Sequence, residues 1–267
     1  MAFLTHTNPE YLSSTLLDAV PHCFSTRHGG VSTGHLASLN LGIHRGDLRE
    51  NVLENYRILG EAVGFRPEQT VFTHQTHTAN VVRVGQGDRT HGLYSEVTEE
   101  RDGLITNEPG VALTVFSADC TPILLYDPVR QAVGAVHAGW RGTAAGIVNH
   151  AVKAMAQEFG SRPGDLRAAI GPCIGQCCFE TDRDVPDAML AALGESARAA
   201  IHDDENGKYH VDLKQLNTIW LQNAGVTQID VCPACTACQP NRFWSHRRVG
   251  NARGSLAAII MLKEEPS

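Results

Sequence analysis

The chain has 267 residues, of which 42% are hydrophobic and 19% charged, a composition typical of a globular protein and not of a disordered or fibrous one. Its formal net charge of −7 argues against a nucleic-acid binder, which usually presents a basic surface. No apolar run reaches the roughly 18 residues of a membrane span, and the N-terminus has no basic segment followed by an apolar core, so we expect a cytoplasmic protein without membrane contact.

The predicted elements begin with an apolar strand at Cys23 that runs into a glycine turn. Apolar residues then recur at spacings of three and four from Arg49 to Val63, which predicts a helix ended by Gly64. Short apolar runs predict strands at residues 71–73, 79–84, 102–106, 111–116, 122–126 and 133–136. The polar, glycine-containing segment 85–98 predicts a surface loop.

The second half of the chain mixes helices and strands in the same way. Helices are predicted from Thr143 to about Phe159, over 184–201, and over 212–224 with Asp212 as the N-cap. Strands are predicted at 168–171, 229–232 and 256–262. Because several strands follow one another between helices, the pattern predicts an α+β protein and not a strictly alternating parallel one. No repeat or linker interrupts the chain, so residues 1–267 are predicted to form one domain.

A histidine and a cysteine come directly after buried strands. His137 follows the apolar run that ends at Val136, and Cys120 closely follows the run that ends at Phe116. His77 lies between two further apolar stretches; His74, three residues earlier, would point to the opposite face of a strand. Three ligands of this softness suit zinc with one open coordination position. The eight cysteines are interpreted mainly as reduced thiols because a chain of this length needs no disulfide framework.

Two further motifs leave their roles open. The glycine turn at 139–143 leads into a helix start, which could bind phosphate with help from Arg141 or serve only as a tight turn. Cys232, Cys235 and Cys238 resemble a metal knuckle that Cys173 or the pair at 177–178 could complete, but spacing alone does not show this. We interpret these cysteines as structural thiols.

Motifs along nearly the whole chain resemble those of a bacterial purine nucleoside phosphorylase family formerly labelled multicopper polyphenol oxidase, or laccase-like. The motifs in chain order are STRHGGVS (25–32), SLNLG (38–42), HQTH (74–77), SADCTP (117–122), HAGWRG (137–142), IGPCI (170–174) and FWSHRR (243–248). The resemblance implies one α+β domain in which mixed sheets pack together and helices flank them. It also implies that His77, Cys120 and His137 are the metal ligands, while Thr78 replaces the family's usual glycine.

The resemblance implies zinc-dependent phosphorolysis of adenosine, inosine, guanosine and methylthioadenosine, with adenosine deamination as a second reaction. The catalytic set is then His77, Cys120, His137 and Asp119. The residues expected to bind substrate or phosphate are Arg27, Asn40, His74 and Arg141. The His-x-Glu element of nucleobase deaminases is absent, so Asp119 and His74 are the candidates for proton transfer.

Two alternatives belong to other enzyme classes. The older family label implies copper-dependent oxidation of phenols, but multicopper sites typically use His-x-His pairs, and none of the thirteen histidines is two residues from another. A single His–Cys–His site could still take copper. A metal-free hydrolase would instead use Cys120 as nucleophile and His137 as base. A non-catalytic binding module is disfavoured by the clustered ligands.

Overall fold

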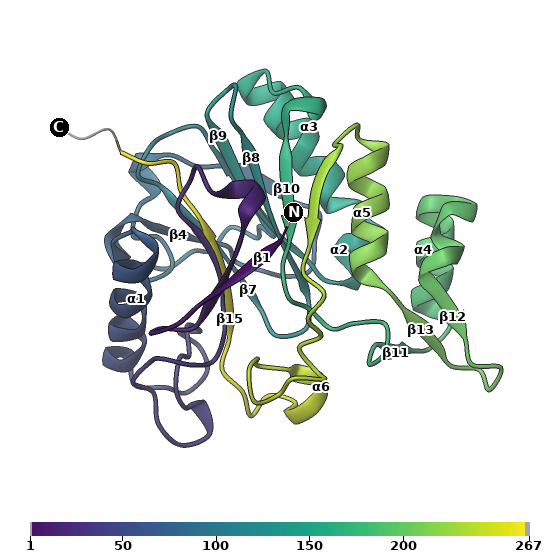
Figure 1. Ribbon diagram of the computed structural model, residues 1–267, viewed down its shortest axis with the longest axis horizontal. Helices are drawn as coiled ribbons and strands as arrows, with labels where there is room; N and C mark the ends of the chain where they lie inside the picture. Colours follow the sequence, from purple (N-terminus) through teal and green to yellow (C-terminus); the bar gives the residue numbers. More distant parts are fainter. Residues whose placement is uncertain (1, 265–267) are drawn as a thin grey trace.

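Two six-stranded mixed sheets packed face to face form the centre of the molecule in the computed structural model, which describes residues 2–264 (Figure 1). The first and the last three residues of the predicted domain lie outside the described residues. The first sheet has the order β1 (Phe3–His6), β2 (Tyr11–Ser14), β3 (His22–Ser25), β15 (Leu256–Ile260), β7 (Ala112–Ser117), β4 (Thr70–Phe72). The second has the order β14 (Gln228–Val231), β10 (Arg167–Ile170), β8 (Thr121–Asp127), β9 (Ala132–Ala138), β6 (Gly103–Thr106), β5 (Val81–Arg83).

The central strands are apolar on both faces because each sheet is covered on both sides. In β15, Ala258 and Ile260 belong to the core between the two sheets, whereas Ala257 and Ile259 pack on the opposite face. This alternation follows from the two-residue period of a strand. It also explains why these strands read as continuous apolar runs in the sequence.

Helices complete the layers on the two outer faces. Helix α1 (Arg49–Val63) packs on the first sheet, and α3 (Ile147–Phe159) and α5 (Leu213–Asn223) cover the second. The predicted bounds of α1 are confirmed, with Gly64 in the left-handed region at φ 100°. The Asp212 side chain caps α5 by accepting a hydrogen bond from the backbone N–H of Gln215, as predicted.

Two predicted helices are wrong in part. The helix expected from Thr143 to Phe159 divides into α2 (Trp140–Ala144) and α3, because Gly146 has φ 71° and the indole N–H of Trp220 donates to the carbonyl of Thr143. The helix expected over 184–201 is α4 (Asp184–Leu193), followed by a 3₁₀ segment that starts at Gly194. Over residues 2–264, no helix has the length and apolar character needed to cross a membrane.

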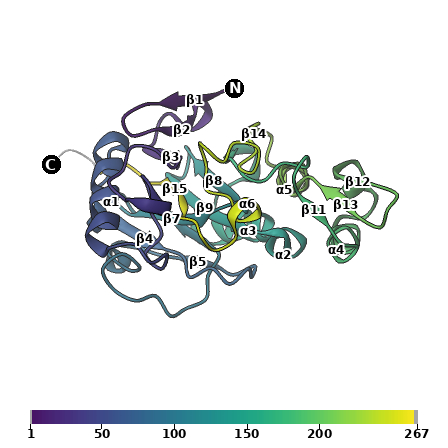
Figure 2. The same ribbon diagram turned by 90° about the horizontal axis from the view of Figure 1, so that it is seen from below.

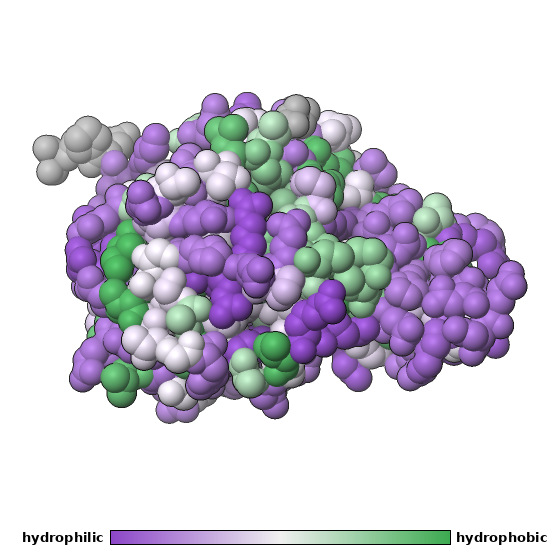
Figure 3. Space-filling view, turned by 60° about the horizontal axis from the view of Figure 1, so that its bottom comes forward, coloured by the Kyte–Doolittle hydropathy of each residue, from purple (hydrophilic) through white to green (hydrophobic). Residues whose placement is uncertain are grey.

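A small third sheet projects from the body beside α4. It has the order β11 (Glu180–Thr181), β13 (Tyr209–Val211), β12 (Ile201–Asp203), and the sequence did not predict it because its strands are short. Figures 1 and 2 both place it at the far end of the long axis, and Figure 3 shows that this end is mainly hydrophilic. The predicted α+β class, with sheets packed together and helices outside, is confirmed.

Candidate metal and anion site

A buried aspartate organises the turn that carries His77. Asp102, which is fully buried directly before β6, accepts hydrogen bonds from the backbone N–H groups of Thr76, His77 and Thr78 at 2.9–3.2 Å. The Thr78 hydroxyl donates a fourth, at 2.9 Å. His77 itself has φ 65°, a left-handed conformation that costs a non-glycine residue free energy unless its surroundings hold it. Asp102 therefore fixes the backbone of the turn from which the His77 side chain projects, and Thr78 adds a contact that glycine could not make.

The same carboxylate also orients His137. His137 lies at the end of β9, is 2% exposed, and has Nδ1 2.7 Å from Oδ1 of Asp102. That hydrogen bond leaves Nε2 free to act as a ligand, which is the arrangement in which carboxylates usually support metal-binding histidines. Burial raises the pKa of the Asp102 carboxyl, but the interaction with His137 and the Thr78 donors outweighs it and lowers that pKa to about 2.

Cys120 completes the set from the turn between β7 and β8. Its carbonyl accepts a hydrogen bond from the Ser117 hydroxyl, and its Sγ lies 3.8 Å from Nε2 of His77. The ligand atoms of His77, Cys120 and His137 all lie within 4.8 Å of one another. Burial raises the pKa of the Cys120 thiol, but the neighbouring His137 and His77 lower it to about 6. Conversely, burial lowers the pKa of His137, while Cys120 and Asp102 raise it to about 9.

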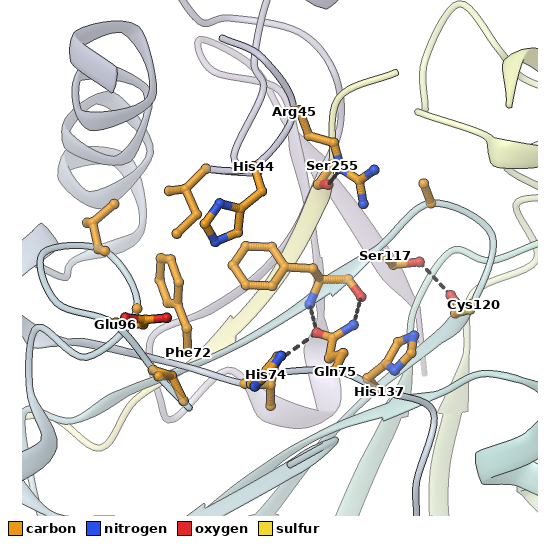
Figure 4. Close-up of a pocket in the computed structure, with 18 of the residues that line it drawn as sticks. His44, Arg45, Phe72, His74, Gln75, Glu96, Ser117, Cys120, His137 and Ser255 are labelled. Atoms are coloured by element: carbon orange, nitrogen blue, oxygen red, sulfur yellow. Dashed lines mark hydrogen bonds between the residues drawn. The ribbon is translucent and has the colours of Figure 1, made fainter. Parts of the chain in front are cut away.

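This donor set fits zinc. One thiolate and two imidazoles are the ligand types that zinc prefers, and three protein ligands leave the fourth tetrahedral position for another group. The thiolate form that metal binding requires is already favoured by the two histidines. The set lies at the edge of a cavity of about 860 Å³, which Figure 4 shows with Cys120 and His137 on one side and His44 and Arg45 on another.

Two arginines in this cavity form no ion pair with a carboxylate of residues 2–264. Arg45 Nε donates to the Ser255 hydroxyl at 3.2 Å, and Arg253 Nη1 donates to the carbonyl of Gly254 at 3.0 Å. Within residues 2–264, no carboxylate lies within 4.0 Å of either guanidinium. Burial and the charge of Arg45 lower the pKa of Arg253 to about 10 against the raising effect of Asp119 and Cys120, and its buried Nε has no hydrogen-bond partner among the described residues. An anion bound between the two side chains would supply the missing partner.

The residues predicted to bind substrate or phosphate differ in whether they line the cavity. His74 lines the cavity, with Nδ1 3.3 Å from the carbonyl of Thr98. Arg27 lies 3.7 Å above the ring of Trp244 and donates to two backbone carbonyls, so it is outside the cavity lining. Arg141 is exposed and stacks on Trp140 at 4.2 Å.

Asn40 and Asp119 also lie behind the cavity wall. The buried Asn40 side chain accepts hydrogen bonds from the N–H groups of Gly42 and Ser255, and so supports two wall segments. Asp119 has φ 99°, and its carboxylate accepts hydrogen bonds from the Thr236 and Ser245 hydroxyls and the N–H of Arg247 at 2.6–3.0 Å. These contacts turn the carboxylate away from the cavity and hold the turn that presents Cys120.

The sequence analysis missed Asp102, Arg45 and Arg253. The signal for Asp102 was an aspartate directly before a buried strand. Each of the two arginines is directly followed by a glycine near an apolar segment: Arg45 by Gly46, and Arg253 by Gly254. These signals are weak singly, because only the folded arrangement brings the three residues to one cavity.

The chain can be assigned to a known class of protein by comparison with known sequences and structures. Residues 21–263 match the family described as multi-copper polyphenol oxidoreductase laccase, and the chain belongs to this family. The purine nucleoside phosphorylase YlmD of Geobacillus stearothermophilus is 40% identical over 245 residues, which are 90% of this chain and 89% of that protein.

Solved structures agree with this assignment. The crystal structure of YlmD from Geobacillus stearothermophilus has a TM-score of 0.90 and 38% identity, covering 95% of this chain and 96% of that chain. The Bacillus licheniformis hypothetical protein YfiH has a TM-score of 0.93 and 35% identity, covering 97% of this chain and 99% of that chain. The fold described above is therefore shared by solved members of the family.

Proposed function

We propose that the protein is a zinc-dependent purine nucleoside phosphorylase acting on adenosine, inosine, guanosine and methylthioadenosine, with adenosine deamination as a second reaction. One arrangement supports this function: a zinc-type ligand set lines the same cavity as two arginines that have no ion-pair partner in the described part of the chain. The relatives named purine nucleoside phosphorylase support the choice of substrate class.

The cavity suits a nucleoside together with phosphate. Its volume of about 860 Å³ lies within the range of small-molecule sites. Phe116 and Tyr94 offer aromatic surface on which a purine ring can stack. Arg45 and Arg253 offer the charge and the forked donors that phosphate requires. We assign the phosphate to these two residues in place of Arg27 and Arg141.

In phosphorolysis, a phosphate oxygen forms a bond to the anomeric carbon of the ribose while the bond from that carbon to the purine nitrogen breaks. The electron pair of the broken bond leaves with the base, which takes up a proton. Arg45 and Arg253 hold the phosphate in position, which contributes to the rate by orientation and by charge stabilisation. Bound zinc supplies Lewis acidity at the His–Cys–His set. Asp102 holds the ring of His137 and the backbone of the turn that carries His77, so both ligands are positioned by one carboxylate.

In deamination, water adds to the amino-bearing carbon of adenine and ammonia leaves. This requires a group that moves a proton from the water to the leaving nitrogen. His74 lines the cavity, whereas the Asp119 carboxylate already accepts three hydrogen bonds behind the wall. We therefore assign the proton transfer to His74.

The test is product analysis after incubating zinc-loaded protein with adenosine, with and without phosphate. Adenine formed only with phosphate supports phosphorolysis, and inosine formed without phosphate supports deamination. The absence of any purine product from metal-loaded protein would refute the proposed function. Oxygen consumption with a phenol and stoichiometric copper would instead support the oxidase implied by the family's older label.

A metal-free hydrolase is the second candidate, because the proximity of Cys120 to His137 and His77 favours its thiolate at neutral pH. This candidate predicts that activity survives a strong chelator and that an electrophilic substrate analogue is trapped on Cys120. Loss of activity on chelation, with recovery when zinc is returned, excludes it.

A further inference from the structure

A second group of metal-type ligands lies outside the cavity. Cys177 and Cys178 belong to the segment between β10 and β11, and Cys235 and Cys238 to the segment between β14 and α6 (His246–Val249). The four Sγ atoms all lie within 4.8 Å of one another. Sγ of Cys238 is 3.5 Å from that of Cys177 and 3.4 Å from that of Cys178. All four cysteines are free thiols.

The backbone locks these two segments together independently of the thiols. Cys173 and Cys235 form a parallel bridge, and the N–H of Thr236 donates to the carbonyl of Cys173 at 3.0 Å. These contacts lie between chain positions about sixty residues apart. The fold itself therefore brings the four sulfur atoms together, so the cluster is preorganised for a ligand.

The spacing of the sulfur atoms suits a tetrahedral metal ion. With metal–sulfur bonds of about 2.3 Å, neighbouring sulfur atoms in a tetrahedron lie about 3.8 Å apart. Two distances in the cluster are 3.4 and 3.5 Å, and no pair exceeds 4.8 Å. Small adjustments of the side chains would therefore bring all four sulfur atoms to bonding distance of one ion.

The surroundings also suit metal-bound thiolates. The N–H of Gly175 donates to Sγ of Cys235 at 3.1 Å, a contact of the kind that stabilises negative charge on a ligating sulfur. A Cβ at Gly175 would lie 3.2 Å from Cβ of Cys235 and 3.3 Å from Sγ of Cys177, so glycine permits this close approach. Four thiolates around one zinc ion carry a net charge of −2, and two arginines bind carbonyls of the same segments: Arg247 that of Cys178, and Arg248 that of Ala237.

We propose that Cys177, Cys178, Cys235 and Cys238 bind a second zinc ion in a closed, four-sulfur structural site. Four protein ligands leave no open position, so this ion has no direct role in the reaction. It would clamp the segment before β11 to the segment before α6. Through Thr236, which donates to Asp119, the clamp would also support the turn that presents Cys120.

The test is the zinc content of protein purified under reducing conditions. We expect two zinc ions per chain in the wild type, one in Cys238→Ser and one in Cys120→Ala. Cys232→Ala is the matched control, because Cys232 is a buried cysteine of the same segment that lies outside the cluster, and it should retain two. Wild-type zinc content in Cys238→Ser would overturn the proposal.

X-ray absorption at the zinc edge of Cys120→Ala keeps the test decisive if Cys238→Ser fails to fold. The remaining zinc should show four sulfur neighbours at about 2.3 Å. Nitrogen or oxygen neighbours, the absence of zinc from Cys120→Ala, or a disulfide between members of the cluster in the reduced wild type would each overturn the proposal.

Discussion

Replacing Arg253 tests the assignment of phosphate to the arginine pair. Arg253→Ala removes one of two guanidinium groups that face the cavity without an acidic partner among the described residues. A hydrogen bond to a charged group contributes about 1.5–3 kcal/mol, and about 1.4 kcal/mol corresponds to a factor of ten in affinity. We therefore expect the KM for phosphate to rise roughly ten- to hundred-fold. The KM of Arg253→Lys for phosphate should lie between those of the wild type and Arg253→Ala, because lysine keeps the charge but loses the forked donor geometry.

Arg141→Ala is the matched control. Arg141 was also predicted to bind phosphate, but it is exposed and stacks on Trp140, so its removal should leave the KM for phosphate unchanged. The assay is initial-rate phosphorolysis of inosine at saturating nucleoside and varied phosphate, with thermal unfolding measured in parallel to show that both variants fold. An unchanged KM in Arg253→Ala, or a rise of equal size in Arg141→Ala, would refute the reasoning.

Three further substitutions test the metal site. Cys120→Ala should abolish phosphorolysis and deamination, because two histidines are too few to bind zinc tightly. Its melting temperature should stay near that of the wild type, because the cavity left by the side chain is small. Wild-type activity in this variant would show that Cys120 is not part of the site. Asp102→Asn should weaken zinc binding by about 10–100-fold in chelator competition, because it changes the partner of His137; unchanged affinity would contradict this. Gly139→Ala should also weaken zinc binding, because a Cβ there would lie 2.7 Å from Cδ2 of His77. Zinc binding equal to that of the wild type would contradict this and show that His77 can move aside without cost.

The sequence predicted most of the central strands because their physical signal is local. Strands covered on both faces must be apolar throughout, so their runs stand out without any knowledge of pairing. Helix α1 was predicted to the residue because its apolar spacing and its terminal glycine agree. The break between α2 and α3 was not predicted, because it depends on Trp220, a residue more than seventy positions away.

The site, like the fold, has residues that local sequence reveals and residues whose role depends on distant parts of the chain. His77, Cys120 and His137 could be proposed from their chemistry and from their places beside buried strands, and the fold brings their ligand atoms within 4.8 Å. Asp102 could not be chosen in that way, because its role depends on reaching the 76–78 turn and β9 at once. Arg27 is predicted to bind substrate or phosphate, but its guanidinium lies over Trp244, a contact across more than two hundred residues that the sequence does not reveal.

Ribose 1-phosphate is the product that distinguishes a phosphorylase from a hydrolase. Wild-type protein is incubated with inosine and phosphate, and hypoxanthine and ribose 1-phosphate are quantified in the same sample, before and after removal of zinc by a chelator. We predict equal amounts of the two products from the zinc-loaded protein and neither product after chelation. Hypoxanthine accompanied by free ribose, or equal product yields with and without zinc, would contradict zinc-dependent phosphorolysis.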